Sequence, residues 1–223
     1  MRITSLILTF LFVITGVTTA QSLLLQEDFS FNPGTDLAGQ NGWTKGVAGT
    51  NLVTISDTGL SLAGYPNSGT GKAASFIPTS DRNQKTFTGT LSGAYYYSFM
   101  ISVASAGTGD YFIGLYSNSA FRGRVYLKSD GAGFQFGVVK TTTGTVTYTT
   151  GVPYNYNTVY SGVVKYEFSS ATTTDDKVSL YINPDFGAAE LGTANIGPIT
   201  DLGNDVIANV IAIQGRANCG TFI

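Results

Sequence analysis

The chain has 223 residues, of which only 12% are charged, and it contains 12 Lys and Arg, 14 Asp and Glu, and no histidine. The net charge of −2 and the lack of clustered basic residues argue against a nucleic-acid-binding protein, which needs a cationic patch for phosphates. Without histidine, Ser-His-Asp and Cys-His catalysis and His-ligated metal sites are excluded.

Residues 1–20 have the pattern of a secretory signal peptide. Met1 and Arg2 give a positive start, residues 3–17 are mostly apolar, and Thr18, Thr19 and Ala20 are small. The apolar stretch is short and polar, strand-like sequence follows it, so we expect a removable leader and no membrane insertion afterwards. The mature protein would then begin at Gln21 and be secreted, or remain at the cell surface.

Residues 21–223 are expected to form a single all-β domain, a two-sheet antiparallel jelly-roll sandwich. Apolar and polar residues alternate with period two, and Gly, Asn and Asp turn signals recur about every ten residues. Asp130-Gly131, between two strand-like runs, is the strongest hairpin signal. In chain order we expect strands at 23–29, 52–55, 95–103, 111–116, 124–128, 134–140, 146–149, 164–168, 178–182 and 206–213.

A resemblance to a known family rests on seven segments that span nearly the whole mature chain. They are LLQEDF (24–29), GWT (42–44), GYPNSG (64–69), GDYF (109–112), FRGRV (121–125), KSDG (128–131) and VSLYINP (178–184). In this order they resemble a concanavalin A-like, laminin-G-like jelly-roll domain of secreted bacterial surface proteins of the Bacteroidetes type. The resemblance implies two curved antiparallel sheets, and it allows carbohydrate binding, glycoside hydrolysis or a rim calcium site.

We expect the last strand of this family pattern to be incomplete here. The family closes with a strand beside the first one, whereas this sequence reaches only Phe222 and Ile223 at that point. Either the chain is truncated or a strand from another molecule completes the sandwich by β-augmentation. We therefore expect a non-enzymatic extracellular structural protein that assembles with copies of itself, head to tail into a fibril, through Leu23, Leu25, Phe29, Phe222 and Ile223.

A cell-surface carbohydrate-binding module is the alternative function. Sugars stack on exposed aromatic rings and accept hydrogen bonds from neighbouring polar groups. The candidates are Trp43, whose other interpretation is a core residue, and Tyr154 and Tyr156, which alternate with asparagines in a loop. The partner would be a polysaccharide, or a glycan O-linked to the abundant Ser and Thr.

A glycoside hydrolase-like enzyme is a weaker alternative, because no Glu-x-Asp-x-x-Glu motif supplies paired carboxylates and the chain has only Glu27, Glu167 and Glu190. No cofactor is expected, although a calcium ion held by Asp175 and Asp176 is a further hypothesis beside a solvated turn. Cys219 is the only cysteine and is expected to be a small buried apolar residue.

Overall fold

The computed structural model describes residues 22–223 except 89–92, 118–119, 152, 189–190 and 206–207. The predicted signal peptide, residues 1–20, lies outside the described residues. Within them the secondary structure is entirely β, and there is no helix that is long and apolar enough to cross a membrane. The prediction of an all-β antiparallel sandwich is confirmed.

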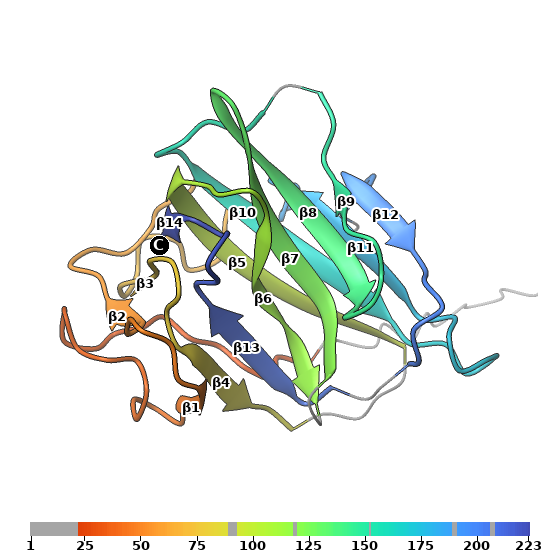
Figure 1. The fold of residues 1–223 in the computed structure, drawn as a ribbon, viewed down its shortest axis with the longest axis horizontal. Coiled ribbons are helices and arrows are strands. Elements are labelled where there is room, and N and C mark those ends of the chain that lie inside the picture. The colour runs from red at the N-terminus through yellow and green to blue at the C-terminus, as the bar shows by residue number, and fades with distance from the viewer. Residues whose placement is uncertain (1–21, 89–92, 118–119, 152, 189–190, 206–207) are drawn as a thin grey trace, which may run out of the picture.

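Two antiparallel sheets make up the sandwich, and Figure 1 shows β6, β7 and β8 crossing over β5 and β10 of the sheet behind. The seven-stranded sheet has the order β1 (Thr44–Val47), β4 (Arg82–Thr86), β13 (Val210–Gln214), β6 (Asp110–Ser117), β7 (Ala120–Asp130), β8 (Gly133–Thr141) and β9 (Thr147–Tyr148). The five-stranded sheet has the order β12 (Ile196–Ile199), β11 (Lys177–Ile182), β10 (Val159–Glu167), β5 (Ala94–Ser105) and β14 (Thr221–Phe222). A small third sheet pairs β2 (Thr54–Ile55) with β3 (Ala74–Ser75).

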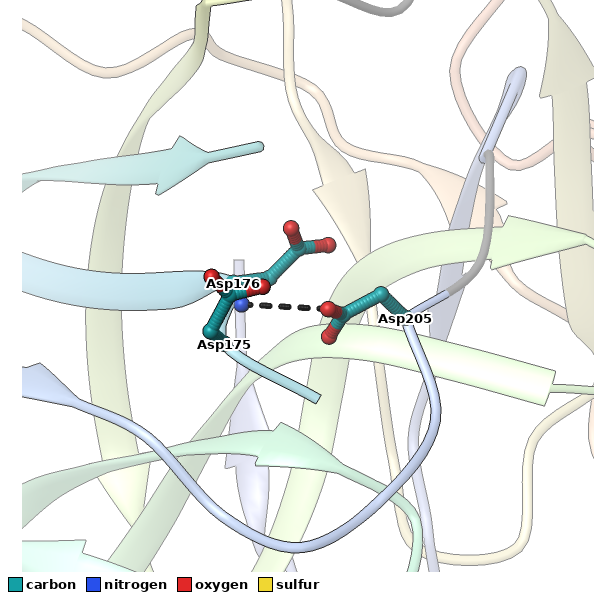
Figure 2. Close-up of side chains that lie close together, drawn as sticks. All are labelled: Asp175, Asp176 and Asp205. Atoms are coloured by element: carbon teal, nitrogen blue, oxygen red, sulfur yellow. Dashed lines mark hydrogen bonds between the residues drawn. The ribbon is translucent and has the colours of Figure 1, made fainter. Parts of the chain in front are cut away.

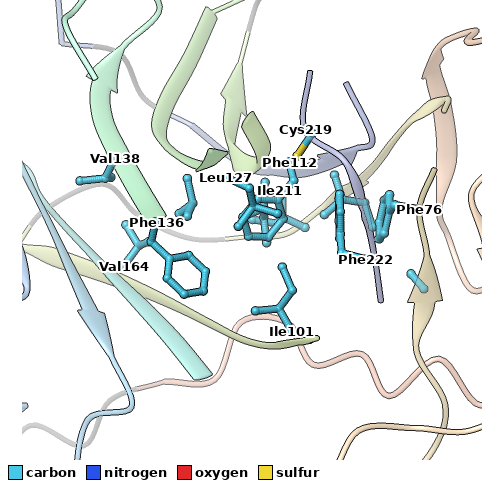
Figure 3. Close-up of a cluster of buried hydrophobic side chains, with 14 of the residues drawn as sticks. Phe76, Ile101, Phe112, Leu127, Phe136, Val138, Val164, Ile211, Cys219 and Phe222 are labelled. Atoms are coloured by element: carbon cyan, nitrogen blue, oxygen red, sulfur yellow. The ribbon is translucent and has the colours of Figure 1, made fainter. Parts of the chain in front are cut away.

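The core lies between the two large sheets and is built by the predicted alternation. On β7, Val125 and Leu127 are fully buried and face inward, and on β10 Val164 and Tyr166 do the same from the opposite sheet. Cys219 is also fully buried in this core, as predicted, and Figure 3 shows it among the apolar side chains. Burial raises the pKa of its thiol, which disfavours the reactive thiolate.

The hairpin predicted at Asp130-Gly131 is confirmed. It joins β7 to β8, with Asp130 paired to Gly133. Gly131 has a φ of +63°, a left-handed conformation that favours glycine. These two long strands lie between β6 and β9 in the seven-stranded sheet.

The strand predicted at 23–29 is wrong, since residues 22–30 contain no strand. Local hydrogen bonds compete with strand pairing here, because the backbone N–H of Phe29 donates to the Glu27 carboxylate and that of Ser30 donates to Asp28. Phe29 also has a φ of +51°, which interrupts an extended chain.

The prediction that the last strand is incomplete stays a prediction, but the structure shows that Phe222 and Ile223 are already paired within the chain. Phe222 pairs with Val103 of β5, and Ile223 exchanges two backbone hydrogen bonds with Ser102. On its other side Phe222 exchanges backbone hydrogen bonds with Phe76. The C-terminal residues are thus enclosed between β5 and Phe76, and they fill this corner of the sandwich from within.

Candidate functional site

The residues predicted for carbohydrate binding do not form an exposed platform. Trp43 is 3% exposed, its indole N–H donates to the Glu27 carboxylate at 3.0 Å, and Phe29 stacks on it with a ring-centroid distance of 6.0 Å. Because the Trp43 ring is almost fully buried, it has no free face on which a sugar could stack. Its core interpretation is therefore the one that fits.

Tyr154 and Tyr156 are half-buried and pack on a core ring. Their centroids lie 5.8 and 5.7 Å from that of Phe134, which is fully buried. Tyr154 also exchanges two backbone hydrogen bonds with Phe134, and the Tyr156 hydroxyl lies 3.3 Å from that of Ser129. Both tyrosines thus tie the loop before β10 to β8, which leaves less ring face for a ligand than the sequence suggested.

The residues predicted for assembly are mostly engaged within the chain. Phe222 is 2% exposed and stacks on Phe76 with a centroid distance of 4.6 Å, which Figure 3 shows at one end of the core. Leu25 and Phe29 are partly buried against the same core. Leu23, at 74% exposed, is the member of this set that projects freely.

A second aromatic cluster, which the sequence did not reveal, lies on the outer face of the seven-stranded sheet. Tyr111 and Phe121 are buried there, and Tyr116 and Tyr126 pack against them, separately from the main core. We call this cluster, together with the cationic side chains around it, the Arg–Tyr face; its members are Arg82, Tyr111, Tyr116, Phe121, Arg124, Tyr126, Lys128 and Arg216.

Strand alternation places these residues on the side away from the core. Because Val125 and Leu127 point inward, Arg124 and Tyr126, which alternate with them, point outward. Arg82 reaches the same face through its pairing with Gln214, whose amide oxygen lies 3.4 Å from the Tyr111 hydroxyl.

The guanidinium groups stack on the aromatic rings. The Arg82 guanidinium carbon lies 4.4 Å from the centroid of the Tyr116 ring, and that of Arg124 lies 4.7 Å from Tyr111 and 5.4 Å from Tyr126. The Arg216 guanidinium carbon lies 5.4 Å from the centroid of the Tyr111 ring, and its Nε lies 3.5 Å from an Asp110 carboxylate oxygen. Cation–π contacts of this kind hold a guanidinium plane in a fixed orientation on the sheet.

Burial disfavours the charged form of two tyrosines of this face, Tyr111 and Tyr126. It raises the pKa of Tyr126 to about 12 and raises that of Tyr111, against the smaller opposing effect of nearby arginines. Their hydroxyls therefore remain neutral hydrogen-bonding groups over the whole physiological pH range.

A group of three carboxylates, which we call the acidic cluster, lies where the two sheets meet at one end of the sandwich. Asp175 and Asp176 directly precede β11, Asp205 lies in the loop before β13, and one carboxylate oxygen from each lies within 4.8 Å of the others. Figure 2 shows the three side chains and the hydrogen bond from the Asp176 N–H to Asp205, which measures 3.2 Å. The sequence suggested the first two residues and missed the third, which lies far along the chain.

A lysine ammonium group already neutralises part of this cluster. Lys140 of β8 is fully buried, and its Nζ lies 2.8 Å from an Asp205 oxygen and 3.7 Å from an Asp201 oxygen. A calcium ion bound by Asp175, Asp176 and Asp205 would share the Asp205 carboxylate with Lys140. The calcium site predicted at Asp175 and Asp176 stays a prediction, and Asp205 lies close enough to be a further candidate ligand.

Asp176 is expected to make stability depend on pH. The residue is 1% exposed, and this burial is the main cause that raises its pKa above the ordinary 3.8. Hydrogen bonds donated by the Ser169 N–H and the Tyr166 hydroxyl act in the opposite direction but are weaker. A raised carboxyl pKa stabilises the fold below pH 3.8, and that stability is lost as the pH rises through the folded-state pKa. We expect the free energy of unfolding of the wild type to fall relative to Asp176→Asn over this range, as measured by urea denaturation at several pH values; a constant difference would contradict it.

A small cleft of about 250 Å³ lies elsewhere, between two loops beside β10. Residues 62–64 line one wall and residues 183–186 the other, with the fully buried Ser161 among them. Its volume is below the ~300–1,000 Å³ usual for ligand pockets, so the Arg–Tyr face is the better candidate site.

Comparison with known proteins does not identify a family. No protein-family profile and no curated protein matches the chain. Two solved structures are similar over most of it. One, a point mutant of a protein designated HCR/D, is 13% identical with a TM-score of 0.42; the match covers 80% of this chain and 45% of that one.

The other similar structure is the CBM2 module of an evolved Dit protein from Lactobacillus casei BL23 phage J-1. It is 11% identical with a TM-score of 0.41, and the match covers 83% of this chain and 88% of that module. This chain thus spans less than half of the first structure and most of the second. At TM-scores below 0.5, neither likeness identifies a family or a function.

Proposed function

We propose that this chain is an extracellular, non-enzymatic carbohydrate-binding module that binds its glycan on the Arg–Tyr face. The observation that carries the proposal is an aromatic cluster outside the core, on the outer face of the larger sheet. Sheet faces in soluble proteins are usually covered by short polar side chains, so a cluster with two buried aromatic rings there calls for an explanation.

The chemistry of the face suits a sugar. Tyr116 and Tyr126 are partly exposed, and each combines an apolar ring with a hydroxyl group. The Tyr116 hydroxyl accepts a hydrogen bond from Arg82, and burial raises the pKa of Tyr126 to about 12. Arg82 and Arg124 supply further N–H donors beside these rings. A broad sheet face of this kind fits a polymer chain better than a small free molecule, which would need a deeper pocket.

The other two functions predicted from the sequence have less support. Assembly by strand exchange rested on an open corner of the sandwich, which Phe222 and Ile223 occupy from within. Hydrolysis of a glycosidic bond needs two accessible carboxylates. Glu27 is paired with Lys85, and Asp176 is buried and accepts two hydrogen bonds.

The proposal is tested by retention on immobilised polysaccharides and on a glycan array. Tyr116→Ala and Tyr126→Ala are expected to reduce glycan affinity at least tenfold, because stacking area and a hydroxyl are lost together. The matched control is Tyr181→Ala, a half-buried tyrosine of β11 in the other sheet. Loss of binding with Tyr156→Ala alone would instead place the glycan at the loop before β10, and no retained glycan would refute the proposed function.

A further inference from the structure

We propose that the glycan bound by the Arg–Tyr face is acidic, a polysaccharide that carries carboxylate or sulfate groups. This inference rests on the proposed function and specifies the ligand of the same site. Two features of the face support it: its balance of charges and the burial of its arginines.

The face has a surplus of positive charge. It carries Arg82, Arg124, Lys128 and Arg216, and the ion pair found among them in the described part of the chain joins Arg216 to Asp110 at 3.5 Å. In the described residues, no carboxylate oxygen lies within 4.0 Å of the other three cations. Since the whole chain has a net charge of −2, this surplus is local to the face.

The contacts of Tyr111 show the same surplus of positive charge. The guanidinium carbons of Arg124 and Arg216 lie 4.7 and 5.4 Å from the centroid of its ring, and the Asp110 carboxylate is paired with Arg216. An anion near this ring therefore meets more positive than negative charge, so its interaction with the face is attractive.

Arg124 shows that this charge is also poorly solvated. It is 7% exposed, and its NH2 group donates to the carbonyls of Thr141 and Thr142 at 3.4 and 3.0 Å, while its Nε has no hydrogen-bond partner. A guanidinium does not lose its proton at physiological pH, so the charge persists without a carboxylate to balance it.

Arg82 adds a further unpartnered donor to the same face. Its Nε is buried without a hydrogen-bond partner. Its NH2 group donates to the Tyr116 hydroxyl at 3.4 Å. A bound anion would supply the compensating charge that the chain itself does not provide here.

The stacked geometry favours planar or multi-oxygen anions over a point charge. The Arg82 and Arg124 guanidinium planes are held by ring contacts, so they lose little freedom when they bind. Uronate carboxylates and sulfate groups both present several oxygens to such planes. Both chemistries are therefore tested.

The experiment measures affinity for four polysaccharides by isothermal titration calorimetry: polygalacturonate as the carboxylate, dextran sulfate as the sulfate, and dextran and soluble cellulose derivatives without charge as neutral probes. Arg124→Gln and Arg82→Gln are expected to weaken acidic binding at least tenfold. Arg216→Gln and Lys128→Gln, at more exposed positions, are expected to weaken it severalfold. Lys177→Gln, an exposed lysine of the other sheet, removes the same charge and is expected to change nothing.

The outcomes separate the two proposals. Affinity for one or both acidic polymers that falls with added NaCl and with the Arg216→Gln variant supports the inference, and the preferred polymer identifies the anion. Binding of neutral polymers that is unaffected by salt and by Arg216→Gln overturns the acidic specificity and leaves the carbohydrate-binding function. An equal loss with Lys177→Gln overturns the site, and no binding to any polymer overturns the function itself.

Discussion

Phe222→Ala is expected to lower the free energy of unfolding by about 3–5 kcal/mol, the cost of removing a buried phenylalanine from a packed core. The Phe222 ring is 2% exposed, stacks on Phe76 at 4.6 Å and meets the edge of Phe112 at 5.3 Å. Its backbone also bridges β5 and Phe76, so the side chain holds the last strand in place. Urea denaturation followed by the fluorescence of Trp43, the single tryptophan, measures the change.

Leu23→Ala is the matched control, because the sequence assigned both residues to one assembly surface. Leu23 is 74% exposed, and its truncation is expected to change stability by less than about 0.5 kcal/mol. If Phe222→Ala were as mild as Leu23→Ala, the C-terminal residues would not close the sandwich, and completion by a strand from another molecule would again be the better hypothesis.

The fold was predictable where apolar and polar residues alternate along a strand. Val178, Leu180 and Ile182 alternate with Ser179 and Tyr181, and this period predicted β11 correctly. The sequence of β4, RNQKT, has no apolar alternation, although the strand lies between β1 and β13 and Asn83 is fully buried. Polar strands that sit inside a sheet give no hydrophobic signal, and β4 was therefore missed.

The Arg–Tyr face could not be predicted for a related reason. The run from Tyr111 to Tyr116 is almost continuously apolar, so it predicts a strand without saying which side chains point outward. Tyr111 and Tyr116 are five residues apart and would lie on opposite faces of a regular strand. The register shifts on either side of Ile113, so both tyrosines join the same outer cluster. Bulges are set by tertiary pairing, which the sequence pattern does not contain.

The acidic cluster shows that the sequence pattern also does not reveal contacts between residues that are far apart in the chain. Asp175 and Asp176 are neighbours in sequence and were recognised, whereas Lys140 and Asp205 come from β8 and a distant loop. The sequence therefore suggested a cation site from two carboxylates, and the structure adds a buried ammonium group that changes the charge balance. Only the packing of the two sheets brings these groups together.

Asp205→Ala is expected to cost about 3 kcal/mol or more, because it removes the main partner of a buried charge. The Lys140 side chain is fully buried, and its Nζ lies 2.8 Å from both Asp205 and the Thr174 carbonyl. After the substitution the nearest carboxylate is that of Asp201 at 3.7 Å, which compensates the charge only in part. The Asp176 N–H loses its acceptor as well.

The ion pair of Lys165 with Glu167 provides the control, since its atoms are also 2.8 Å apart while its side chains are 25% and 37% exposed. Glu167→Ala is expected to cost under about 1 kcal/mol, because water and salt screen an exposed pair. Urea denaturation of both variants at neutral pH compares two ion pairs that have the same N–O distance but differ in the burial of their side chains. Equal losses would mean that Lys140 gains solvent or another partner when Asp205 is removed, and that the cluster does not hold the two sheets together.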